Sequence, residues 1–131
     1  MKTVTADWLR SARADLETID AILDNPELTA MVAFHAQQCV EKCLKALVEE
    51  FAIEVGKTHN LLALKAAVES QQAIDLDEDT LSLLNKLYIS SRYPSEFGLL
   101  PTGAPSPEDS AAFARFASEV RRKVLDVLEN Q

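Results

Sequence analysis

Glycine is scarce in this chain, with three among 131 residues. Phosphate-binding loops and tight two-residue hairpins need glycines at fixed positions, so the sequence argues against both. One segment, Gly56 to Thr58, shares the end of a P-loop but lacks its first glycine and any preceding strand. We interpret it as the end of one helix and the start of the next, with Lys57 placed where an anion can bind a helix N-terminus.

Long apolar runs are absent as well. No segment approaches the roughly 18 apolar residues that suggest a membrane-spanning helix. Asp7, Arg10 and Arg13 interrupt the first stretch, which therefore does not resemble a signal peptide. The two cysteines, Cys39 and Cys43, stand one helical turn apart, an awkward geometry for a disulfide. We therefore expect a soluble, cytoplasmic protein with no membrane contact.

Basic residues are outnumbered, with 13 lysines and arginines against 21 acidic residues and a net charge of −8. A broad nucleic-acid surface needs clustered cations, so nucleic acid is not an expected partner. The densest basic stretch, from Arg115 to Lys123, is better explained as cations near the C-terminus of a helix.

The sequence does contain strong helical patterning. Hydrophobic residues make up 47% of the chain, are mostly Leu and Ala, and recur every three or four positions. This spacing predicts helices over residues 5–24 and 27–51 and a third helix capped by Thr58. Trp8 falls in the apolar stripe of the first of these helices. The acidic run at 75–79 is expected to open a fourth helix, and Ser106 to cap a fifth.

These elements predict an all-α fold, an antiparallel up-and-down bundle of four or five helices. No convincing strand is present, and the proline-rich residues 94–105 are expected to form a loop. The length suits a single helical domain over residues 1–131.

A metal site is the first chemistry to consider. His35, Cys39 and Cys43 follow one another at intervals of four residues, which places imidazole and thiolate ligands on one helix. Only three ligands are present, and cysteine is among the most readily buried residues. Core packing therefore explains the spacing better, and we expect no metal, no cofactor and unreactive thiols.

The polar side of the second helix is a stronger candidate. One interpretation is a solvated face with a Glu41–Lys45 ion pair. Another is an interface or ligand site, because Met31 and Phe34 share this side. The polar residues concerned are Gln38, Glu41, Lys42 and Lys45.

The end of the fourth helix offers a second set of groups. The Arg92 guanidinium is able to cap carbonyls, pair with a buried acid or bind phosphate, and Tyr93 is able to stack on a base.

Three segments resemble those of prokaryotic HEPN-domain proteins: QQCVEKCLKAL at 37–47, KTHNL at 57–61 and YISSRYP at 88–94. The resemblance covers nearly the whole chain. It implies a four- or five-helix bundle, usually dimeric, associated with minimal nucleotidyltransferases, often in a toxin–antitoxin pair. Many members are metal-independent ribonucleases that use an arginine followed four to six residues later by a histidine.

Arg92 stands where that arginine is expected, but the only histidines are His35 and His59, both before it. This absence argues against an enzyme. The leading hypothesis is a non-catalytic module that binds a nucleotide or a partner nucleotidyltransferase. Other hypotheses are a ribonuclease with an atypical site around Arg92 and a purely structural dimer or scaffold. The expected binding residues are Gln38, Glu41, Lys42, Lys45, Lys57, His59, Arg92 and Tyr93.

Overall fold

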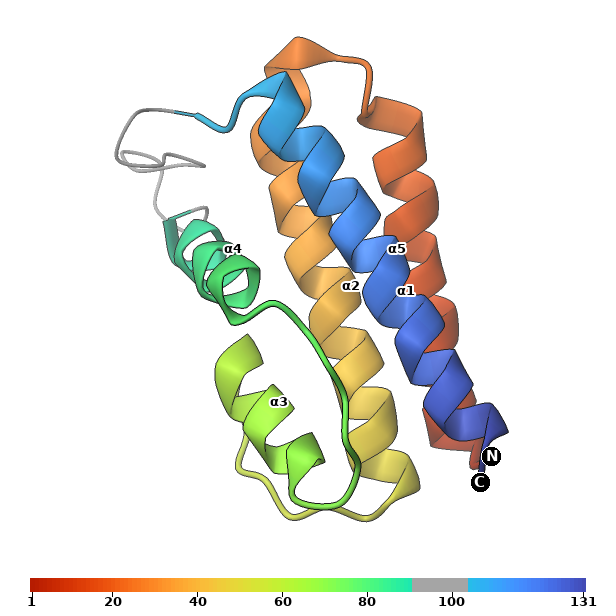
Figure 1. Ribbon diagram of the computed structural model, residues 1–131. Helices are drawn as coiled ribbons and strands as arrows, with labels where there is room; N and C mark the ends of the chain where they lie inside the picture. The colour runs from red at the N-terminus through yellow and green to blue at the C-terminus, as the bar shows by residue number, and fades with distance from the viewer. Residues whose placement is uncertain (91–103) are drawn as a thin grey trace.

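The structure, a computed structural model, describes residues 1–90 and 104–131. Within those ranges the chain is all helical and has no strand, which confirms the predicted fold class (Figure 1). The α-helices are α1 (Thr3–Ile22), α2 (Thr29–Glu50), α3 (Leu61–Glu69), α4 (Glu78–Ser90) and α5 (Pro107–Glu129), with a 3₁₀ turn, η1, at Pro26–Leu28.

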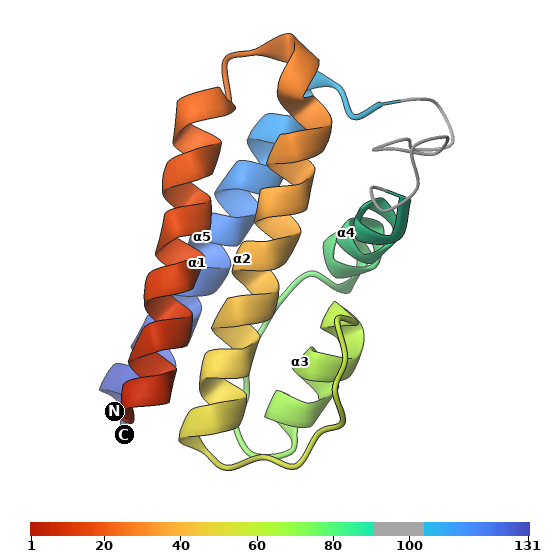
Figure 2. The ribbon, with the colours of Figure 1, turned by 180° about the vertical axis from the view of Figure 1, so that it is seen from behind.

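The three long helices, α1, α2 and α5, pack together as a bundle. α1 runs antiparallel to both α2 and α5, and the two chain ends lie together at one end of the bundle (Figures 1 and 2). The shorter α3 and α4 pack on the other side of α2, and α4 is seen nearly end-on in both views because it crosses the long helices steeply. α2 is therefore the central helix and contacts all four others.

The buried side of α2 explains this central position. Its apolar residues occupy a broad arc, as predicted, and include Leu44 and Leu47, which are both fully buried. Cys39 and Cys43 also lie inside this core as free thiols. The contact with Cys39, together with burial, raises the pKa of the Cys43 thiol, which therefore stays protonated.

Several helix ends differ from the predictions. α2 begins at Thr29 because Asn25 caps the preceding 3₁₀ turn by accepting a hydrogen bond from the Glu27 amide. It ends at Glu50, well before Gly56, and Ala52 adopts a left-handed φ of 51°. The N-cap of α3 is Asn60 and not Thr58, since the Asn60 side chain accepts hydrogen bonds from the next helical amides.

The predicted start of α5 is confirmed. The Ser106 hydroxyl accepts from the Asp109 amide, and the Asp109 carboxylate accepts from the Ser106 amide, which together form a capping box. No helix in the described ranges is long and apolar enough to cross a membrane.

Candidate functional site

Glu41 lies at the centre of a buried polar cluster beside α2. One interpretation of the sequence placed it on a solvated face, but the structure leaves it only 5% exposed, so that interpretation is wrong. The segment between α2 and α3 brings His59 onto the carboxylate. The predicted pair with Lys45 is present, with Nζ 2.8 Å from Oε2.

The charge of Glu41 is held by its hydrogen bonds. Burial alone would raise its pKa, but hydrogen bonds from Lys45, Gln37 and His59 outweigh that effect and lower the pKa below its ordinary value. Glu41 is therefore an anion at neutral pH and orients the groups that surround it.

His59 is the exposed member of this cluster. Its Nδ1 lies 3.1 Å from both carboxylate oxygens of Glu41, while its side chain is 56% exposed. Because a carboxylate only accepts, Nδ1 donates to Glu41, and whenever the ring is neutral Nε2 keeps its lone pair. The ring also lies 5.4 Å from the Tyr88 ring, centroid to centroid, so an aromatic neighbour limits its movement.

Two glutamines of α2 support the cluster through hydrogen bonds. Gln37 is fully buried, and its Nε2 donates to Glu41 Oε1 at 3.1 Å and to the His59 carbonyl at 3.3 Å. Gln38 Nε2 donates to Gln37 Oε1 at 2.7 Å. Gln38 therefore acts through Gln37. The predicted site left out Gln37, although this residue opens the motif at 37–47 and stands four residues before Glu41, where a helical neighbour is expected.

Two asparagines, Asn60 and Asn85, hold the segment that carries His59. The Asn85 carbonyl oxygen on α4 accepts from the Leu61 amide at 2.9 Å, and the Asn85 amide donates to the Asn60 side chain at 2.9 Å. Asn60 is the N-cap of α3, so the start of that helix is tied to α4. His59 stands directly before this cap and is positioned by it.

The cluster opens onto a hollow of about 440 Å³, here called the Trp8 groove. Three predicted binding residues, Lys45, Lys57 and His59, line it together. Trp8 on α1 forms another wall, and Lys45 Nζ lies 5.4 Å from the centroid of its ring. The sequence assigned Trp8 only to the apolar stripe of the first helix, so this wall was missed. The remaining lining residues are Val48, Glu49, Val55, Gly56, Thr58 and Leu64.

Lys42 lies apart from the Trp8 groove. Its Nζ is 2.8 Å from Oδ2 of Asp15, a buried residue of α1 whose other oxygen is 2.9 Å from His35 Nδ1. These contacts join α1 to α2 and give Lys42 and His35 a structural role.

Phe34, on the same helix, is half-buried and not exposed, since it stacks on Tyr88 with 6.1 Å between ring centroids.

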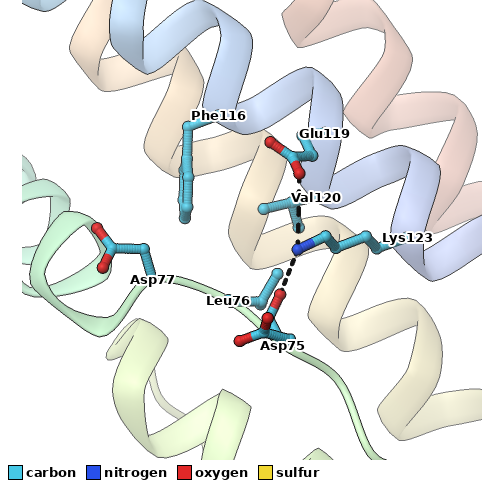
Figure 3. Close-up of a pocket in the computed structure, with 7 residues that line it drawn as sticks. All are labelled: Asp75, Leu76, Asp77, Phe116, Glu119, Val120 and Lys123. Atoms are coloured by element: carbon cyan, nitrogen blue, oxygen red, sulfur yellow. Dashed lines mark hydrogen bonds and ion pairs between the residues drawn. The ribbon is translucent and has the colours of Figure 1, made fainter.

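Basic residues of α5 pair with nearby acidic side chains and a backbone carbonyl. It lies in the middle of α5, and the last turn holds no basic residue, so the expected dipole role is wrong. Arg122 pairs with Glu119 and Asp126, and Lys123 with Glu119 and the Asp75 carbonyl. A hollow of about 280 Å³ beside Lys123 is lined by three acidic residues and does not suit an anion (Figure 3). The three are Asp75, Asp77 and Glu119.

Arg92 and Tyr93 lie outside the described residues. In the described ranges, no group of three metal-ligating side chains comes together. The six predicted site residues that the structure describes divide into three sets: those that line the Trp8 groove, those that support it, and Lys42, which lies elsewhere. Gln38 and Glu41 are the supporting residues.

Comparison with models of known families matches residues 5–130 to the HEPN domain. Two crystal structures are similar over nearly their full lengths. TT1696 from Thermus thermophilus is 25% identical, with a TM-score of 0.70, and the match covers 95% of this chain and 98% of that one. ST0689, an archaeal HEPN homologue, is 24% identical, with a TM-score of 0.65 and coverage of 96% and 98%. No curated protein matches the chain.

Proposed function

This chain belongs to the HEPN domain family, and on that basis we propose that it is a non-catalytic module that binds a nucleotide in the Trp8 groove. The observation that supports this most is the meeting of Lys45, Lys57 and His59 at one hollow beside an indole ring. The two lysine ammonium groups suit a phosphate, and the aromatic wall suits a base. The groove volume of about 440 Å³ is in the range of small-molecule sites, roughly 300–1,000 Å³.

Lys57 offers the cleanest test of the phosphate contact, because it is exposed and lies outside the Glu41 cluster. We expect Lys57→Ala to weaken binding of adenosine 5′-monophosphate about tenfold, as a lost charged hydrogen bond costs roughly 1.5–3 kcal/mol. Isothermal titration calorimetry measures the change. The matched control is Lys86→Ala, which removes an exposed lysine of α4 that does not line the groove. Absence of binding to the wild type, or equal binding by Lys57→Ala, would refute the proposal.

Metal-independent RNA cleavage is a second candidate, favoured by one observation. The Glu41–His59 contact leaves Nε2 as a proton acceptor, which is what a general base for a ribose hydroxyl requires. If so, the wild type cleaves RNA in the presence of a chelator and His59→Asn does not. His35→Asn is the matched control, because His35 is the other histidine of the chain and binds Asp15 instead. No cleavage by the wild type would exclude this candidate.

Three further features of the proposal stay predictions. A homodimer and a minimal nucleotidyltransferase partner in a toxin–antitoxin-like pair are implied by the family resemblance, and a cytoplasmic location is inferred from the sequence. The proposal also treats residues 1–131 as one HEPN unit.

A further inference from the structure

Trp8 separates two hollows of different character. On one side is the Trp8 groove with its lysines, and on the other is a hollow of about 360 Å³, here called the Val4 hollow. Trp8 and Glu49 line both, so the two spaces adjoin across the indole. The Val4 hollow is lined by Val4, Asp7, Trp8, Ser11 and Glu49.

Each of these two spaces is lined by one exposed apolar side chain. In the part of the chain that the structure describes, the exposed large hydrophobic side chains are Met1, Val4 and Val55, at 70%, 41% and 37%. Val4 lines the Val4 hollow and Val55 lines the Trp8 groove. Exposed apolar groups gathered beside an indole are unusual on a surface where such residues are otherwise buried, and they favour a flat apolar ligand.

The two spaces differ in the charged residues that line them. The Trp8 groove is lined by Lys45 and Lys57 and by one acid, Glu49, whereas the Val4 hollow is lined by Asp7 and the same Glu49 and by no lysine or arginine. The first space therefore suits a phosphate better than the second. The amino groups of a nucleobase, which donate hydrogen bonds, suit the carboxylate side.

We propose that Trp8 is the base-recognition residue of this site: the nucleobase stacks on the indole toward Val4, and the phosphate lies on the side of Lys45 and Lys57. This inference rests on the proposed nucleotide binding and adds its orientation and its selectivity. A purine with an amino group is the favoured base, because it offers the larger stacking surface and a donor for Asp7 or Glu49.

Tryptophan fluorescence measures this contact directly, because Trp8 is the only tryptophan in the sequence. We expect adenosine 5′-monophosphate to change the intrinsic fluorescence of the wild type at saturation. We also expect it to bind about tenfold more tightly than ribose 5-phosphate, which keeps the phosphate and lacks the base. Fluorescence, corrected for ligand absorbance, and calorimetry measure the two effects.

Two variants of Trp8 sharpen the test. Trp8→Phe keeps an aromatic face and is expected to keep most of the preference for the base, whereas Trp8→Leu is expected to bind both ligands equally. Phe116→Leu is the matched control, as Phe116 is a half-buried aromatic of α5 outside both spaces. Circular dichroism confirms that each variant is folded.

The outcomes separate this inference from the function on which it rests. Binding of both ligands with equal affinity by the wild type would overturn the role of Trp8 and leave phosphate binding intact. A base preference that survives in folded Trp8→Leu would also overturn it. Failure of both ligands to bind would overturn the proposed function and this inference together.

Discussion

A Glu41→Ala variant is expected to lose about 2–3 kcal/mol of unfolding free energy and to lose nucleotide binding in its folded state. The carboxylate accepts from three side chains, so its removal affects all of them at once. The loss of hydrogen bonding is most costly at Gln37, because this residue is fully buried and keeps only the His59 carbonyl as an acceptor for its Nε2. Lys45 and His59 lose the anion that holds them at the groove.

The size of this loss follows from the exposure of the partners. Breaking a fully buried ion pair costs roughly 3–5 kcal/mol, since it leaves an uncompensated buried charge. Here the Lys45 and His59 side chains are 24% and 56% exposed, so water solvates them when the carboxylate is gone. The expected cost is therefore below that range. Urea denaturation measures it, and nucleotide titration below the transition measures binding.

Acid dependence gives an independent check on the same carboxylate. The pKa of Glu41 is lowered in the folded state, so its stabilisation is present above the unfolded value of about 4.3 and is lost as pH falls through the folded value. The difference in stability between wild type and Glu41→Ala is thus expected to shrink below about pH 4. A difference that stays constant into acid would show that the charge is not what stabilises the cluster.

Two variants serve as controls for Glu41→Ala. Glu41→Gln keeps the shape and removes the charge, so it separates packing from electrostatics. Glu17→Ala removes an exposed carboxylate of α1 that pairs with Arg13, with side chains 69% and 68% exposed. Such a surface pair contributes about 0–1 kcal/mol. Equal losses in Glu17→Ala and Glu41→Ala would contradict the central position assigned to Glu41.

Local patterns predicted the helices well, and long-range contacts account for what they missed. The start of α5 was readable because Ser106 and Asp109 satisfy each other within one turn. The burial of Glu41 was not readable, because it depends on the segment before α3 folding back onto α2, a contact across 18 positions with His59. A helical wheel shows one helix at a time and cannot show what covers its polar side.

The candidate site was predicted in part for the same reason. Lys45 comes from α2, whereas Lys57 and His59 come from the segment before α3. The family motifs indicated all three before the structure placed them in one groove. Trp8 was assigned to the core because its spacing fits the apolar stripe of α1, and a half-buried aromatic satisfies that pattern equally well. The ring reaches the groove only because α1 lies antiparallel beside α2 (Figure 1).

The core of α2 leads to the second large effect. Leu44→Ala is expected to lower the unfolding free energy by about 3–4 kcal/mol, because the side chain is fully buried in the helix that contacts all the others. Because α2 contacts all four other α-helices, we expect that movement of one helix cannot close the cavity. We expect Tm to fall by roughly 10 °C. Leu62→Ala, at a half-buried position of α3, is the control and is expected to lose less than half as much.

Comparison of Leu44→Ala with Glu41→Ala then separates the scaffold from the site. Leu44 lies in the core, whereas Glu41 bonds to residues that line the Trp8 groove, although the two are three positions apart in α2. The folded fraction of Leu44→Ala should therefore bind nucleotide with the wild-type affinity, and that of Glu41→Ala should not. If both variants lose binding in proportion to stability, the groove depends on global packing and Glu41 has no separate positioning role.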